Sequence, residues 1–139
     1  MYDRERIAVI HGNISHYLRD IDELSIGSVA DLQDRRNYYA LSMVLFSLLD
    51  AVITMASEVV AGMDFGIPTT YREIFSMLHR EGLIDAEMLT VMSTLVSYRN
   101  RLAHQYGEIT PDDLLRILSK INQIRVFTDN MVKLARNAP

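Results

Sequence analysis

Apolar residues recur at steps of three and four along the N-terminal part of the chain. Such steps place the side chains on one face of an α-helix. The stripe consists of Ile7, Ile10, Ile14, Tyr17, Leu18, Ile21 and Leu24. We therefore predict a first helix from about Asp3 to Glu23, which stops near Ser25-Ile26-Gly27-Ser28.

A second stripe predicts a long helix from Ala40 onward that ends between Gly62 and Pro68. Its members are Leu41, Leu45, Leu48, Val52, Met55, Val59 and Met63. The opposite face of this helix is mixed rather than fully polar. It carries Tyr39, Met43, Phe46, Asp50 and Ser57. A face of this kind can pack on another helix or on another subunit.

Capping residues predict two further helices. Thr69-Thr70 offers an N-cap for a short third helix, with Glu73 placed for a capping box and Gly82 at the end. Asp85 is the expected cap of a fourth helix that continues through Glu108.

The sequence also predicts where a fifth helix begins. Thr110-Pro111-Asp112-Asp113 supplies a cap, a first-position proline and an acidic first turn, and apolar residues then recur from Leu114 to Leu134. No strand pattern or repeat interrupts the series. The sequence therefore predicts an all-α fold: an up-and-down bundle of about five helices in a single domain over residues 1–139.

Composition and charge narrow the classes of function. The 139 residues include no cysteine, which excludes disulfides, thiolate nucleophiles and cysteine-ligated metals and favours a cytoplasmic protein. The net charge of −4 does not attract a polyanion, so any nucleic-acid binding needs a local site. Asp50, Glu58 and several Ser and Thr interrupt the most apolar stretch, so we predict a buried helix and no membrane span there.

The predicted fourth helix carries an arginine in its apolar face. Arg99 lies among apolar residues, and a guanidinium there needs an acid, a phosphate or a water-filled crevice. Beside that face runs a polar stripe, which we expect to line a cleft: Ser93, Ser97, Asn100 and His104. A structural interpretation pairs Arg99 with Asp50 and bonds His104 to a carbonyl near the helix end.

Taken together, the residues from Tyr98 to Tyr106 suit phosphate chemistry. They place a permanent cation, an imidazole, an amide and a phenol within about two turns. Metal chemistry has less support, because His11 and His16 are five apart and do not share the face that two ligands need. We therefore expect no metal and no cofactor.

This segment also resembles a known family. Arg99-Asn100, His104 and Tyr106 resemble the R-N-x-L-x-H-x-Y signature of HEPN-domain proteins, and specifically of the HepT toxins paired with minimal nucleotidyltransferase antitoxins. The resemblance extends to Ala40-Leu41, to the segment from Pro68 to Phe75 and to Gly82-Leu83-Ile84-Asp85, and it covers most of the chain from Asp34 onward.

The resemblance implies a metal-independent endoribonuclease that works as a homodimer, with the motif helices of two subunits meeting across a cleft. Cleavage through the 2′-hydroxyl needs a base and an acid on opposite sides of phosphorus, and a two-fold axis supplies both from two copies of His104. Arg99 would then meet the charge that grows on the phosphoryl oxygens, with Asn100 and Asp50 as supporting residues.

The resemblance also implies a partner. Tyr106 resembles the target of AMP transfer by the nucleotidyltransferase antitoxin, and an added phosphodiester would fill the cleft and repel RNA. The expected partners are thus RNA, the cognate antitoxin and a second copy of the chain. The alternative is a non-catalytic HEPN adaptor or nucleotide-binding partner of a nucleotidyltransferase, in which Arg99 makes only an ion pair.

Overall fold

The computed structural model describes residues 3–104 and 108–137, and within them every regular element is helical. The all-α prediction is therefore confirmed. In chain order the elements are α1 (Arg4–Leu24), the short 3₁₀ helix η1 (Asp31–Gln33), α2 (Arg35–Gly62), α3 (Tyr71–Arg80), α4 (Ala86–His104), α5 (Pro111–Leu118) and α6 (Ile121–Asn137).

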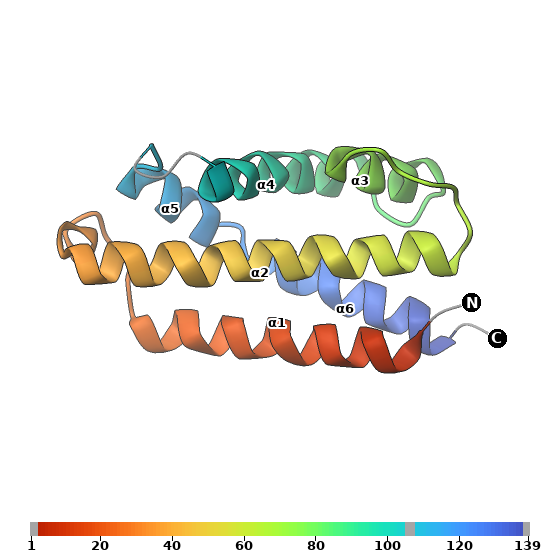
Figure 1. The fold of residues 1–139 in the computed structure, drawn as a ribbon, viewed down its shortest axis with the longest axis horizontal. Helices are drawn as coiled ribbons and strands as arrows, with labels where there is room; N and C mark the ends of the chain where they lie inside the picture. The colour runs from red at the N-terminus through yellow and green to blue at the C-terminus, as the bar shows by residue number, and fades with distance from the viewer. Residues whose placement is uncertain (1–2, 105–107, 138–139) are drawn as a thin grey trace.

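The long helix α2 is the centre of the bundle. It packs against every other element, with α1 along one side, α3 and α4 along the other and α6 behind (Figure 1). Its predicted stripe is buried except for Met63, which follows the helix and is exposed, and Leu41, Leu45, Leu48, Met55 and Val59 have no exposed surface. By length and composition α2 could also cross a membrane, but half of its most apolar window is buried inside the structure. A core helix that contacts all its neighbours accounts for that hydropathy.

Two helix boundaries differ from the prediction by several residues. The second helix begins at Arg35, not Ala40, because the Asp34 side chain accepts a hydrogen bond from the backbone of Arg36 and caps it. The fourth helix is described as far as His104, and Glu108, its expected last residue, lies outside any helix.

The segment predicted as one fifth helix is divided into α5 and α6. At the break, the Ser119 hydroxyl donates to the carbonyl of Arg116 and the Lys120 amide donates to that of Ile117, which closes a tight turn. The turn leaves Ile117 and Ile124 both fully buried. It lets α5 pack on α2 while α6 reaches α1, α2 and α4.

The start of α4 is fixed by the short α3 and the turn after it. Thr70 caps α3 as expected, while the Glu73 carboxylate reaches one residue further back and accepts bonds from the amide and hydroxyl of Thr69. Gly82 ends the segment at φ +78°, a left-handed conformation that favours glycine. Asp85 then caps α4 by accepting a bond from the Met88 amide at 2.8 Å.

Candidate functional site

Arg99 leaves α4 toward α2 and is largely enclosed. Its side chain is 14% exposed, against 47% for Asp50, its ion-pair partner on α2. The Nε and Nη2 atoms donate to the same Asp50 oxygen, Oδ1, at 3.2 and 3.0 Å. The Arg99–Asp50 ion pair that the sequence analysis offered as a structural role for Arg99 is therefore present. The Asp50 carboxylate is the more exposed member of the pair.

Two aromatic rings complete the surroundings of Arg99. The guanidinium carbon lies 5.2 Å from the ring centre of Phe46 on α2 and 4.9 Å from that of Tyr71 on α3. Contacts at this distance stabilise a cation by about 0.5 to 2 kcal/mol each. Three helices thus orient one guanidinium. The sequence analysis assigned neither ring to Arg99, although it placed Phe46 on the same face of the second helix as Asp50.

Asn100 and His104 occupy more exposed positions on α4. The Asn100 side-chain oxygen accepts a weak bond of 3.4 Å from Nη1 of Arg99, and His104, the last described residue of α4, is exposed. In an α-helix a step of five residues turns by about 140°. The imidazole and the guanidinium therefore leave the helix axis in different directions.

An ion-pair cluster joins the end of α4 to the start of α5. Asp113 is 6% exposed, and its carboxylate accepts bonds at 3.1 Å from both Arg101 and Arg116. Burial raises the pKa of Asp113, but hydrogen bonds from Thr110 and the charge of Arg101 outweigh it and hold the pKa below its usual value. The carboxylate is therefore charged at neutral pH and bridges two arginines.

Tyr38 adds a second connection at the same end of the bundle. Its hydroxyl donates to the carbonyl of Ile109, which ties α2 to the segment before α5. Desolvation is the main cause that raises the pKa of the Tyr38 phenol, so the phenol keeps the proton that this bond requires.

The sequence matches one family model over most of its length. The model describes ribonuclease HepT-like proteins, and it matches residues 14–131. The chain belongs to the HepT-like family. That range includes α4 and every residue of the Arg99 surroundings described above. No curated protein matches the chain by sequence.

Solved structures show the same fold for this HepT-like chain. Similar structures include a toxin–antitoxin complex with AMP-PNP (TM-score 0.82, 20% identity, 94% of this chain and 99% of that one). A tri-AMPylated Shewanella oneidensis HEPN toxin in complex with an MNT antitoxin gives TM-score 0.82 at 22% identity, over 94% and 98%. YutE, a cytosolic protein of unknown function from Bacillus subtilis, gives TM-score 0.83 at 20% identity, over 100% and 97%.

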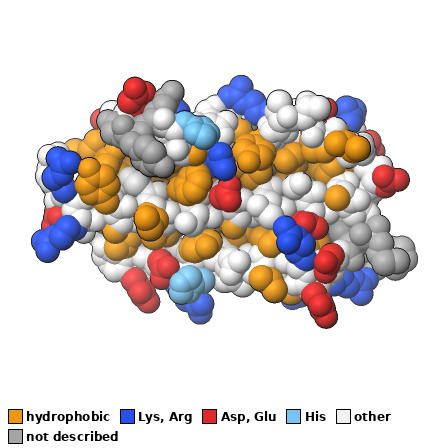
Figure 2. Space-filling view, viewed as in Figure 1, with side chains coloured by type: hydrophobic (Ala, Val, Ile, Leu, Met, Phe, Trp, Pro, Cys, Tyr) orange, Lys and Arg blue, Asp and Glu red, His pale blue; other side chains and the backbone are white. Residues whose placement is uncertain are grey.

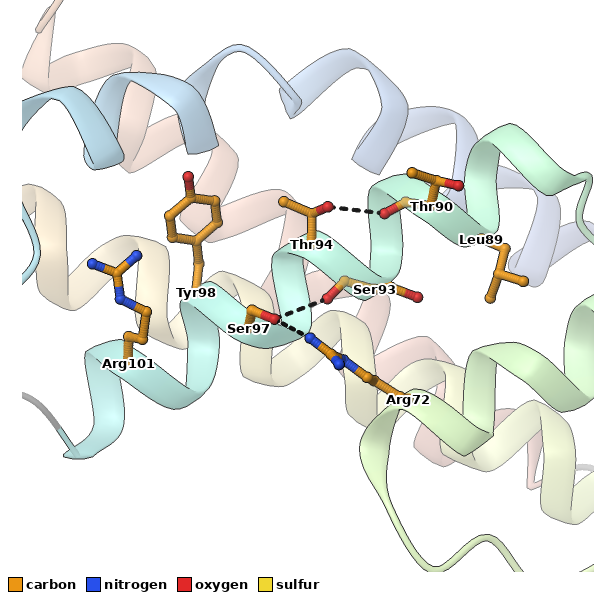
Figure 3. A pocket seen from close by; sticks show the side chains of 8 residues that line it. All are labelled: Arg72, Leu89, Thr90, Ser93, Thr94, Ser97, Tyr98 and Arg101. Carbon is orange, nitrogen blue, oxygen red and sulfur yellow. Dashed lines mark hydrogen bonds between the residues drawn. The ribbon is translucent and has the colours of Figure 1, made fainter.

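The four residues of the polar stripe predicted on α4 do not line one common cleft in this HepT-like structure. Ser93 and Ser97 line a groove of about 590 Å³ between α3 and α4, whereas Asn100 and His104 are not part of its lining. Arg72 on α3 closes the groove by donating to the Ser97 hydroxyl (Figure 3). The sequence analysis did not identify Arg72 as a residue of this groove. Its position in the first turn of α3, directly after Tyr71, was the signal that could have drawn attention to it.

Tyr106 lies outside the described residues, so its role stays a prediction from the resemblance. Metal ligands were not expected, and the described part of the chain holds no group of three His, Asp or Glu side chains that would bind an ion. The residues that the structure does bring together are Arg99, Asp50 and Asn100.

Proposed function

We propose that this HepT-like protein is a metal-independent endoribonuclease, the toxin of a toxin–antitoxin pair, and that it cuts RNA in a cleft shared by two identical subunits. A nucleotidyltransferase antitoxin silences it by transferring AMP to Tyr106. Membership of the HepT-like family supports the proposal, as do the solved toxins of the same fold that are bound to MNT antitoxins.

The observation that carries the proposal is the position of the Arg99–Asp50 pair beside an exposed apolar surface. Tyr39 and Met43 on α2 are 58% and 72% exposed, and Phe46, the next residue of this stripe, stacks on Arg99. Hydrophobic side chains gather along this face, with a cationic, an acidic and a histidine side chain close together near its middle (Figure 2). A second copy that covers the stripe also covers the edge of the pair.

The chemistry follows from two copies of each side chain. One His104 takes the proton of the ribose 2′-hydroxyl, and the other gives a proton to the leaving 5′-oxygen. Two guanidinium groups, each oriented by aromatic rings and a carboxylate, meet the negative charge that grows on the phosphoryl oxygens. AMP on Tyr106 adds a charged phosphodiester two residues from His104, which excludes the RNA backbone.

The dimer is tested by placing a charge in the exposed stripe. Met43→Lys should convert a stable dimer at micromolar concentration into a monomer, because a lysine at the centre of an apolar contact must be desolvated without a partner. Light scattering measures the change. Val126→Lys, at a residue 53% exposed on α6, is the matched control and should remain dimeric. A wild-type protein that is monomeric at this concentration would rule out the shared cleft.

The reaction itself is tested with purified protein and RNA in EDTA. We expect cleavage that leaves a 2′,3′-cyclic phosphate, since the attacking hydroxyl comes from the substrate and both proton transfers come from His104. DNA, which lacks that hydroxyl, should remain intact. Cleavage that depends on magnesium, or equal loss of DNA, would contradict this chemistry.

A non-catalytic adaptor is the second candidate, and the Arg99–Asp50 ion pair is the observation that favours it. A fully structural role would explain the pairing and the stacking without any substrate. It would not require His104 to be exposed at the end of α4. The adaptor predicts no cleavage of any RNA by the chain freed from its antitoxin.

A further inference from the structure

The groove between α3 and α4 lies apart from the Arg99–Asp50 pair. Eight residues line it, and seven of them stand on α4: Leu89, Thr90, Ser93, Thr94, Ser97, Tyr98 and Arg101. The eighth, Arg72, reaches across from α3 (Figure 3). From Thr90 to Arg101 the groove follows α4 for about 16 Å. That length corresponds to roughly five nucleotides at the about 3.4 Å spacing of a stacked strand.

The two charged side chains that line the groove are both positive. Arg72 and Arg101 contribute cations, and no carboxylate lines the groove. Arg72 donates to the neutral Ser97 hydroxyl, and none of the ion pairs found among residues 3–104 and 108–137 includes it. Arg101 shares the single Asp113 carboxylate with Arg116, so this cluster also keeps an excess of positive charge. In a chain of net charge −4, the groove is a local cationic site.

The remaining polar groups of the lining are hydroxyls. Thr90, Thr94 and Ser97 donate their protons to carbonyls one turn earlier on α4, at 3.1, 3.1 and 3.4 Å. The oxygens of Thr90 and Thr94 are therefore available as acceptors, whereas the Ser97 oxygen already accepts the bond from Arg72. A ribose 2′-hydroxyl is a donor that such oxygens can bind, and the phosphates between riboses suit the two arginines.

The groove is in line with His104. Thr90, Ser97 and His104 are seven residues apart, which is nearly two whole turns, so they follow one another along one face of α4. A strand that lies along the groove toward the C-terminal end of α4 therefore arrives at His104.

We infer that this groove holds the single-stranded RNA next to the cleavage site, with Arg72 and Arg101 on its phosphates. The inference rests on the proposed ribonuclease function and names the surface by which that activity binds its substrate. Each subunit of the dimer carries one such groove, so the RNA can extend from the shared cleft over either subunit.

The test uses the full-length protein and an oligonucleotide that spans a cut mapped in total cellular RNA. Arg72→Ala should raise KM about three- to tenfold and leave kcat nearly unchanged. The slope of log KM against log salt concentration should fall by about one, the value expected for the loss of one phosphate contact. Thr94→Glu, which puts a carboxylate at an exposed position of the groove, should raise KM at least as much. In Thr94→Gln, which adds the same bulk without charge, the rise should be several-fold smaller. Arg80→Ala removes a cation from the same α3 outside the groove and should have no effect.

The outcomes separate the two proposals. If the wild-type protein cleaves RNA and neither Arg72→Ala nor Thr94→Glu changes KM, the groove inference is wrong and the ribonuclease remains. If the two variants bind RNA normally but lose the nucleotidyltransferase partner, the groove is a protein interface and the inference is also overturned. If the wild-type protein cleaves no RNA, the proposed function fails and the groove inference fails with it.

Discussion

Replacing His104 with alanine should lower the rate of RNA cleavage by about 10²-fold or more, because the variant loses both the general base and the general acid. The melting temperature and the dimer should change little, since His104 is an exposed residue at the end of α4. Cleavage is measured on a mapped RNA under single-turnover conditions, with thermal unfolding and light scattering on the same samples.

The matched control is His16→Ala. His16 is also an exposed helical histidine, with its imidazole 3.3 Å from Asp20 on α1. This variant should keep full activity. A His104→Ala protein that is folded, dimeric and as active as the wild type would exclude His104 from proton transfer.

Removing the guanidinium should have an effect of similar size. Arg99→Ala is expected to reduce kcat/KM by about 10²-fold or more, because the charge of the transition state loses its strongest donors. The free energy of unfolding should fall by only about 1 to 2 kcal/mol, through lost contacts with Phe46 and Tyr71. Asp50 is half exposed, so water can solvate its carboxylate once the partner is gone.

Two further variants divide the role of Arg99 into charge and geometry. Arg99→Lys keeps the charge and removes the planar fork, so partial activity would indicate simple electrostatics and none would indicate bidentate phosphate binding. Asp50→Asn keeps an acceptor near Nε and Nη2, and it should cost less activity than either change at Arg99. If both Arg99→Ala and His104→Ala unfold the protein and the wild type shows no ribonuclease activity, the motif is structural.

Local rules made most of the helix predictions possible. The first helix was predicted within one residue at each end, and Thr70, Asp85 and Thr110 cap the helices that they were expected to cap. Caps act through hydrogen bonds between neighbours in the chain, so their signal is local. The same reasoning missed the cap at Asp34, because the apolar stripe used to place α2 begins later than the helix itself.

The break at Ser119 had no local signal. The segment contains neither glycine nor an internal proline there, and its apolar residues continue at helical steps. The break lets Ile117 and Ile124 both be buried while α5 packs on α2 and α6 packs on α1, α2 and α4. Tertiary packing therefore overrode helix propensity, which contributes only a few tenths of a kcal/mol per residue.

The sequence by itself determined the all-α fold, membership of the HepT-like family and the need of Arg99 for a partner, since a buried guanidinium must be paired whatever the fold. The sequence also offered Asp50 as that partner, but only the tertiary structure decided that the pair forms and that two aromatic rings complete the surroundings of Arg99. Asp50, Phe46 and Tyr71 come from two other helices, and Arg72 meets Ser97 across the same α3–α4 contact that brings Tyr71 to Arg99. Such pairings depend on how helices pack and not on spacing along one of them, because side chains far apart in the chain become neighbours only when the core forms.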